Sequence, residues 1–445
     1  MMKRVKEFRI LAVAAAILCF AGEVSAQDGD AANSSTPYSL FGFGDILRQG
    51  TSYNLAMGGA GIADRSVRTI NLLNPAAVTA REQKAFMFDI GLENRNTIYQ
   101  NNRIDPFNPE TTISAKSASN TFNIHHIVAS LPIYKHSAFK LGIQPYSSVN
   151  YNFQARESDD ELIAEVGDIN YKRIGEGSLY QAFVGAGVTL WDRLSLGVDG
   201  QWYFGNIERY SIATFNTDAS YRSLTTGWSY VMSGFGAKFG LQYEQPLGKA
   251  ASIRAGATYS LGTDIKGYRT RYAFGVSTNA TDTIRYDQGN INGYRIPAEI
   301  GLALSFSAKD TWTVNVDYTM QDWTGIGFEG SPGVDFFATK ASSIRAGLEY
   351  TPNRYDIRYY FRRVSYRAGF YHEKTYVNVM GHQVAATGVT FGMSFPVFRY
   401  YNAISFGLDI GQRGTMQDNM IRERYVLFNL SFDLFDIWFI KNLYQ

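Results

Sequence analysis

The sequence predicts an all-β protein, a transmembrane β-barrel of about fourteen antiparallel strands with an N-terminal plug segment. Three observations predict this fold. The chain opens with an export signal, it is rich in Tyr (30), Phe (30) and Gly (42), and many segments alternate apolar and polar residues. A tilted strand of about ten residues crosses a bilayer. We therefore expect a multi-pass protein of a Gram-negative cell outer membrane.

The first 26 residues have the pattern of a signal peptide. Four basic residues lie within the first nine positions, the last of them Arg9, and an apolar run follows from Ile10 to Ala21. Val24-Ser25-Ala26 then offers small residues for cleavage after Ala26. The apolar run is too short to span a bilayer as a helix. The only cysteine, Cys19, lies in this stretch. The mature chain is therefore expected to carry no thiol and no disulfide.

Charge excludes one class of partner. The chain has 42 Lys and Arg and 40 Asp and Glu, and the signal segment holds four basic and two acidic residues, which leaves 38 of each. A mature chain close to neutral lacks the basic surface that nucleic-acid binding requires. We expect no nucleic-acid partner. The expected surroundings are outer-membrane lipid.

The segment from Arg424 to Asp436 shows the alternation most clearly. It reads RYVLFNLSFDLFD, with Phe428, Leu430 and Phe432 on one face and Asn429 and its polar neighbours on the other. Residues 252–261 and 311–320 repeat this two-residue period. In a barrel, the apolar face contacts lipid and the polar face lines the lumen.

Fourteen such segments can be counted, and the connections between them alternate long and short. This alternation is typical of a barrel with short periplasmic turns and long outer loops, and it places both chain ends in the periplasm. The predicted strands are 84–93, 120–132, 138–152, 178–190, 193–206, 227–244, 250–263, 292–306, 311–321, 342–350, 356–368, 387–396, 402–411 and 423–435.

The predicted organisation is a signal peptide at 1–26, a plug at 27–83 and the barrel at 84–445. The plug contains MGGAGIAD at 57–64, which looks like the start of a dinucleotide fingerprint. That fingerprint must follow a strand and open a helix within a βαβ unit, and neither condition is met here. The glycines are better explained by backbone that packs closely against a wall.

The plug and the strand layout resemble the FadL family of outer-membrane transporters for hydrophobic compounds. The resemblance rests on Gly58, Gly59 and Gly61 and on the Asn74-Pro75-Ala76 motif just before the first strand. It implies a fourteen-stranded barrel closed by its N-terminus. Asn74 would then satisfy backbone groups of the wall, whereas the alternative is an ordinary turn. PorV-type relatives serve in protein export instead, so the resemblance predicts the fold better than the function.

Pro145 lies within the third predicted strand, where a proline cannot donate to the ladder. The FadL resemblance implies lateral release of ligand through a kink in that strand, so Pro145 is the candidate for a lateral gap. Pro297 in the eighth predicted strand is a second candidate. A simple bulge is the alternative at either position.

Charged residues are predicted to point into the lumen. Pairing with one another and with the plug is the favoured role, and a transport path is the alternative. The ten residues in question are Asp89, Asp199, Arg254, Glu299, Asp317, Arg345, Glu349, Arg358, Asp409 and Asp433.

Enzymatic chemistry finds no support in the sequence. The five histidines show no metal-ligand spacing, and there is no nucleophile motif of the Gly-x-Ser-x-Gly kind. His125 and His126 are adjacent, so a regular strand would turn them to opposite faces. We expect no catalytic residue, no metal and no cofactor.

Two functions follow from the sequence. The first is transport of small hydrophobic molecules across the outer membrane. The alternative is a non-transporting barrel subunit of an outer-membrane export or assembly complex, with other outer-membrane proteins as partners. Loop composition does not separate the two.

Overall fold

The structure, a computed structural model, describes residues 33–437 apart from 82–83, 105–111, 135, 158–159, 216–221, 249, 277–280, 292, 327–334 and 398–401. The predicted signal peptide lies outside the described residues. Within the described ranges, no helix is long and apolar enough to cross a membrane.

The chain forms a closed antiparallel barrel of fourteen strands, which confirms the predicted fold class. Closure is made by the first and last strands, which pair from Ala85↔Ile437 to Gln100↔Arg422. In chain order the wall comprises β2 (Ala85–Ile104), β3 (Thr112–Tyr134), β4 (Ser137–Ser148) with β5 (Tyr151–Arg156), β6 (Ile169–Leu190), β7 (Leu194–Phe215), β8 (Ser223–Leu247), β9 (Ala251–Ser260) with β11 (Lys266–Val276), β12 (Thr281–Asn290) with β14 (Glu299–Ala308), β15 (Trp312–Asp322), β16 (Phe336–Ala338) with β17 (Lys340–Tyr350), β18 (Ser365–Val379), β19 (His382–Pro396), β20 (Ala403–Arg413) and β21 (Arg422–Ile437).

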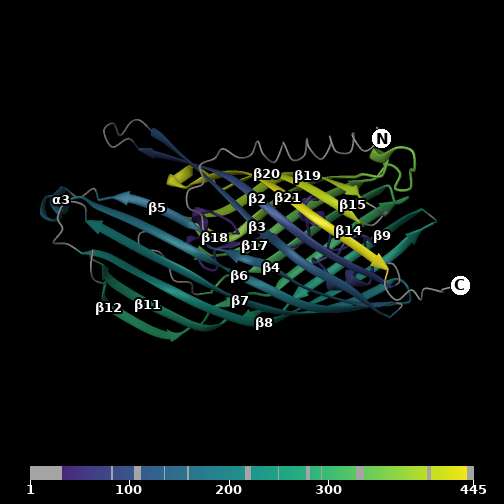
Figure 1. Ribbon diagram of the computed structural model, residues 1–445, viewed down its shortest axis with the longest axis horizontal. Helices are drawn as coiled ribbons and strands as arrows, with labels where there is room; N and C mark the ends of the chain where they lie inside the picture. The colour runs from purple at the N-terminus through teal and green to yellow at the C-terminus, as the bar shows by residue number, and fades with distance from the viewer. Residues whose placement is uncertain are drawn as a thin grey trace, which may run out of the picture.

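Several strands are longer than predicted, so the predicted outer loops 94–118 and 264–291 are largely strand. β2 continues to Ile104 and β3 begins at Thr112, and β11 pairs with β12 within the second loop. These extensions are polar, so hydrophobic alternation did not reveal them. Figure 1 shows β6, β7, β8, β11 and β12 extending together at the end that carries α3 (Asp160–Val166). We call this the loop end and the opposite end the turn end.

The eleventh strand was predicted wrongly. Residues 351–364 form a connection that contains η3 (Tyr360–Arg362), and the strand begins at Ser365. The predicted loop 371–386 is instead a hairpin of β18 and β19 that turns at Met380 and Gly381, with φ values of 51° and 81°. Two consecutive left-handed residues suit a tight hairpin turn. The strict long–short alternation of connections therefore fails at these two places.

β21 shows the predicted separation of faces. Its inward side chains are buried, for example Asn429 at 4% exposure and Ser431 at 1%. The outward side chains Phe428 and Leu434 are 45% and 54% exposed, as expected of a surface that lipid covers.

Leu430→Arg tests the lipid-facing assignment. The substitution is expected to cost about 2–4 kcal/mol of folding free energy in vesicles, because Leu430 lies mid-strand on the outward face. Asp436→Arg, on the same face near the strand end, is the control and is expected to cost about 0–1 kcal/mol. Equal costs in equilibrium denaturation would contradict the assignment.

Residues 33–81, the N-terminal segment, lie inside the barrel (Figure 1, purple). They contain η1 (Pro37–Leu40), β1 (Asp45–Ile46), α2 (Ser52–Leu55) and η2 (Pro75–Thr79). Near the loop end, Phe41 and Phe43 join an apolar cluster with wall residues that include Trp323 and Tyr376. The segment is thus packed as a core would be.

A second irregularity involves the seventh and eighth strands. β9 and β11 are separated by β10 (Thr263–Asp264), and β12 and β14 are separated by β13 (Arg295–Ile296). β10 and β13 pair with each other apart from the main sheet. Pro297 follows β13 directly, and its carbonyl accepts a 2.8 Å hydrogen bond from Gln321. Pro297 therefore marks a break in the eighth strand.

Candidate functional site

The glycines of MGGAGIAD lie where the N-terminal segment touches the wall. Gly58 has a φ of 72°, and a Cβ there would lie 2.6 Å from the carbonyl oxygen of Phe370 in β18. The Gly58 amide donates to Thr390 Oγ1 at 2.8 Å. Beyond it, the amides of Gly61 and Ile62 both donate to Asp317 Oδ2, at 2.7 and 2.8 Å. Only glycine fits this close approach in this backbone conformation.

Asn74 joins the N-terminal segment to itself and to the wall. Its Oδ1 accepts from the amide of Ala76 at 2.9 Å, which caps η2. Its Nδ2 donates to the carbonyl oxygens of Ile62 at 2.9 Å and of Leu241 in β8 at 3.2 Å. Pro75 occupies the first position of η2, where its missing amide hydrogen costs nothing. Asn74 and Ala76 are both fully buried.

Ion pairs connect the N-terminal segment to strands on several sides of the barrel. Arg48 pairs with Asp409 of β20. Asp45 pairs with Arg413 of β20 at 2.9 Å and with Arg95 of β2 at 3.8 Å. These five side chains are at most 11% exposed.

A second set of pairs lies nearer η2. Asp64 faces Arg254 of β9 at 3.7 Å, and Arg65 faces Glu244 of β8 at 3.5 Å. Arg254 and Glu244 also pair with each other at 3.0 Å. The wall therefore offers a linked basic and acidic pair to a matching pair in the segment.

The pKa values of two aspartates of the segment shift in opposite directions. Burial raises the pKa of Asp45, but the charges of Arg413 and Arg95 outweigh burial and hold that pKa below its usual value. Burial also raises the pKa of Asp64, and Arg254 offsets only part of the rise. Asp45 is therefore held as a carboxylate anchor more firmly than Asp64.

Arg358 is the exception among the predicted lumen charges. Arg254, Glu299 and Arg345 lie on the inner face, where Glu299 faces Lys238 at 3.7 Å and Arg345 faces Glu373 at 2.9 Å. Arg358 does not lie in the lumen. It is exposed in the connection 351–364, because the strand predicted there begins only at Ser365.

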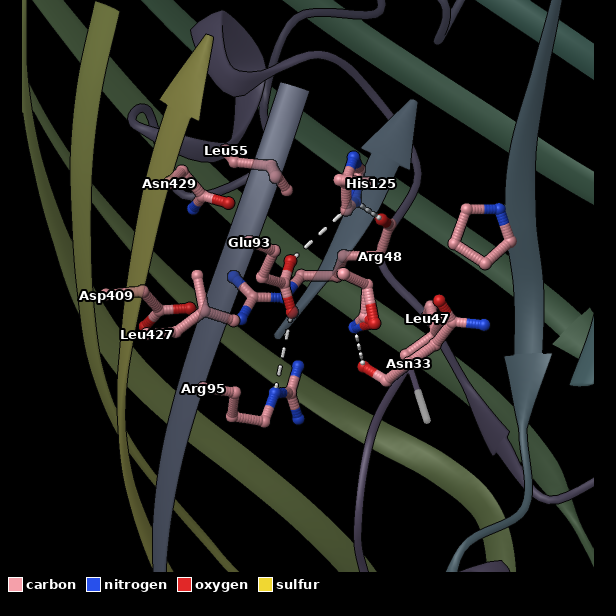
Figure 2. A pocket seen from close by; sticks show the side chains of 12 residues that line it. Asn33, Leu47, Arg48, Leu55, Glu93, Arg95, His125, Asp409, Leu427 and Asn429 are labelled. Atoms are coloured by element: carbon pink, nitrogen blue, oxygen red, sulfur yellow. Dashed lines mark hydrogen bonds and ion pairs between the residues drawn. The ribbon is translucent and has the colours of Figure 1, made fainter. Parts of the chain in front are cut away.

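Figure 2 shows a polar pocket between the N-terminal segment and the wall, in which Glu93 faces both Arg95 and His125. The separations are 3.6 Å to Arg95 Nε and 3.9 Å to His125 Nε2. His125 Nε2 also lies 3.3 Å from the carbonyl oxygen of Arg48. The cavity measures about 20 Å³, which is room for about one water molecule.

His125 and His126 both point inward, contrary to expectation. The register between β2 and β3 shifts at this place, because Gly91 pairs with His126 whereas Leu92 pairs with Ile124. His125 is the extra residue of a β-bulge, and a bulge can turn two successive side chains to one face. The two rings contact each other with Nδ1 atoms 3.0 Å apart, and both are buried.

A larger cavity of about 150 Å³ lies between the segment and the wall. Ile46, Ile62 and Trp323 give it apolar surface, and Arg48 and Glu373 give it charge. An apolar ligand placed there would share the cavity with an ion pair.

Pro145 lies where β4 exchanges one partner for another. β3 and β4 pair from Tyr134↔Ser137 only as far as Ile127↔Ile143. Beyond Pro145, the next residues of β4 pair with β1 through Asp45↔Ser148 and its neighbour. The remainder of β3 pairs with β2 alone. The wall ladder is therefore interrupted between β3 and β4 on the loop-end side.

The N-terminal segment occupies this interruption. The amide of Ser34 donates to Ser148 Oγ at 3.2 Å on the β4 side. On the β3 side, Asn123 donates to the carbonyl oxygen of Asn33 at 3.0 Å, and Tyr99 of β2 donates to that of Ser35 at 2.7 Å. Residues 33–36 thus bridge the two sides of the gap.

Sequence reasoning missed the anchoring residues Asp45, Arg48, Asp64 and Arg65. A signal was present, since each is a charged residue in a segment expected to be enclosed. Buried charges need partners, and the inward charges of the wall supply them.

The comparisons with known proteins agree with this architecture. The model of the BamG family matches residues 1–445. The chain belongs to the BamG family. A search of curated proteins finds no match.

Solved structures place this BamG-family barrel beside FadL-type transporters. The toluene transporter TbuX of Ralstonia pickettii has a TM-score of 0.57 at 16% identity, over 87% of this chain and 98% of that one. The toluene transporter TodX of Pseudomonas putida has a TM-score of 0.54 at 15% identity, over 89% of this chain and 99% of that one. A FadL homologue of Pseudomonas aeruginosa gives 0.51 at 12%, over 88% and 99%.

These structural similarities show that the fold is that of FadL-type outer-membrane barrels. The predicted resemblance is confirmed at the level of the fold. The BamG-family chain is a multi-pass outer-membrane barrel. These structural neighbours are known as toluene transporters and as a monoaromatic hydrocarbon channel.

Proposed function

We propose that this BamG-family protein is a closed barrel that serves as a structural subunit of an outer-membrane protein complex. Residues 27–83 act as a plug that seals the lumen, and both chain ends face the periplasm. One observation carries the closed-barrel part of the proposal. The interruption beside Pro145, the natural place for a lateral exit, is filled by residues 33–36 and by β1.

The buried ion pairs and charged side chains of the lumen support a closed barrel. Passage past the segment requires separation of buried ion pairs such as Asp45–Arg413 and Asp64–Arg254. Separating a buried pair leaves uncompensated charge, which is strongly unfavourable. The pocket beside Glu93 has room for about one water molecule, and the larger pocket, although its surface is more apolar than polar, contains Arg48 and Glu373. An apolar solute there would shield these charged groups from water without offering them hydrogen bonds, which is costly.

Transport of small hydrophobic compounds is the second candidate function. It is favoured by the ladder interruption between β3 and β4 and by the fold shared with the toluene transporters. Under this proposal, residues 33–36 and β1 move aside, and a hydrophobic small molecule leaves toward the membrane beside Pro145.

A disulfide between the segment and β4 separates the two functions. Ile46 and Ser147 are direct partners in the β1–β4 ladder, and Cys19, within the predicted signal peptide, is the only native cysteine. Ile46→Cys/Ser147→Cys is therefore expected to form a lock in the oxidising periplasm. The proposal expects the locked protein to support complex assembly and cell growth at the wild-type level.

The measurements are uptake of radiolabelled toluene and the size of the detergent-extracted complex on native gels, each with and without reductant. Each single-cysteine variant is the control. Loss of uptake that reductant restores, with the protein extracted as a lone barrel, would replace the subunit proposal with the transport proposal.

A further inference from the structure

The connection between β17 and β18, residues 351–364, differs from the other described connections at the turn end. It is fourteen residues long, whereas the fully described turns 191–193 and 309–311 have three residues each. We call it the arginine loop. It contains Arg354, Arg358, Arg362 and Arg363.

The arginine loop has an internal framework. The carboxylate of Asp356 accepts from the amides of Arg358 and Tyr359, at 2.8 and 2.7 Å. The amide of Asn353 donates to the carbonyl oxygen of Arg362 at 2.8 Å. These bonds lie within the loop and help to fix its shape.

The exposed side of this loop combines apolar and basic groups. Ile357 is 92% exposed, Phe361 61% and Tyr359 49%. Arg358 and Arg362 lie 5.4 and 4.8 Å from the ring of Tyr359. The only acidic residue of the loop, Asp356, is engaged by the amides named above and by Arg362 at 3.3 Å. The surface is therefore positively charged as well as apolar.

The loop lies beside the lipid-facing wall. It begins directly after Tyr350, which stacks on Trp312 with ring centroids 4.1 Å apart. Its returning limb is held by the outward-facing Tyr366, whose hydroxyl donates to the carbonyl oxygen of Phe361 at 3.2 Å. The Tyr360 hydroxyl donates to Pro396 at the neighbouring strand end at 3.0 Å. Stacked aromatic residues at strand ends are typical of the headgroup level.

We propose that the arginine loop binds anionic phospholipids at the membrane surface of the turn end. Arg358 and Arg362 contact the headgroup phosphates, and Ile357 and Phe361 enter the region between headgroups and acyl chains. Arginine pairs with phosphate through two parallel hydrogen bonds, and exposed apolar side chains gain by leaving water. This interaction goes beyond the subunit function and does not depend on it.

Quenching by brominated lipids tests the proposal with purified full-length protein. Ile357→Cys is labelled with bimane and reconstituted in phosphatidylcholine vesicles that contain either brominated phosphatidylglycerol or brominated phosphatidylcholine at equal mole fraction. Brominated phosphatidylglycerol is expected to quench more strongly than brominated phosphatidylcholine. The binding constant for phosphatidylglycerol relative to phosphatidylcholine is expected to be about five or more, since each arginine near an anionic surface contributes about 1 kcal/mol. Phe361→Cys gives a second reporter position.

Arg358→Gln/Arg362→Gln in the labelled protein is expected to reduce the binding constant for phosphatidylglycerol relative to phosphatidylcholine to about one. Bimane should still be quenched by both brominated lipids. The matched control is Arg222→Gln/Arg285→Gln, two exposed arginines near the loop end, which should leave the preference unchanged. Equal quenching by both lipids in the parent protein would overturn the proposal. A second result would also overturn the proposal. If neither lipid quenches bimane, and if the Ile357→Cys thiol is protected from maleimide in native membranes but not in vesicles, then a protein partner and not lipid covers the loop.

Discussion

Asp45→Asn is expected to destabilise the protein by about 3–5 kcal/mol, because it removes one partner from a buried charge cluster. Asp45 is the acidic group shared by Arg413 at 2.9 Å and Arg95 at 3.8 Å, with side-chain exposures of 5%, 9% and 10%. Asparagine keeps the size of the side chain but leaves two guanidinium groups without this counter-charge. Glu423 and Glu93, at 3.9 and 3.6 Å from the two arginines, can compensate only in part.

The measurement is equilibrium denaturation in lipid vesicles, combined with maleimide labelling of Ser52→Cys, a buried position of α2. Faster labelling would show that the N-terminal segment has detached. Asp322→Asn is the control, because Asp322 pairs with Lys340 at 3.5 Å in the open, where a lost pair costs about 0–1 kcal/mol. Equal costs for the two substitutions would contradict an anchoring role for Asp45.

The barrel could be predicted because lipid and lumen impose opposite polarity on neighbouring side chains. β21 shows this plainly, with Phe428 outward and Asn429 inward. The same reasoning failed at 356–386. Arginines and tyrosines at 354–363 imitate alternation, whereas Met380-Gly381 turns the chain without the Asn-Gly or Asp-Gly pair that usually signals a two-residue hairpin.

At the candidate site, the sequence draws attention to residues with special backbone properties and not to charge partners. Gly58, Asn74 and Pro145 stand out in the sequence because each constrains its own backbone locally, and the structure places all three where the N-terminal segment meets the wall. The partners of Asp45 lie about 50 and 370 residues away along the chain. Only the folded barrel brings them together. The bulge at His125 likewise depends on register against β2.

The chain has the fold of FadL-type barrels, and its N-terminal segment lies inside the lumen. A strand that leaves its neighbour exposes unpaired amides and carbonyls, which cannot remain open in a membrane. Here β1 supplies backbone partners to β4, and residues 33–36 accept hydrogen bonds from side chains of β3 and β2. The interrupted wall and the N-terminal segment therefore depend on each other. A substitution that weakens the contacts between them is expected to detach the segment and to leave the interruption open.

Gly58→Ala tests this arrangement from the other side of the barrel and is expected to cost about 2–5 kcal/mol. The left-handed backbone at φ 72° adds about 1–2 kcal/mol for any L-residue. The new methyl group would also lie 2.6 Å from the carbonyl oxygen of Phe370, an overpacked contact worth about 1–3 kcal/mol more. The wall strand cannot yield without loss of its own ladder, so the segment is expected to shift.

Gly381→Ala separates the two contributions, because Gly381 has a φ of 81° and nothing lies within 4 Å of the position a Cβ would take. It should cost only the backbone share, about 1–2 kcal/mol. It should also leave the labelling rate of Ser52→Cys unchanged, whereas Gly58→Ala should raise that rate several-fold. If the two alanine variants denature alike and label alike, then close packing of the segment on β18 contributes nothing, and the glycine at position 58 serves backbone conformation alone.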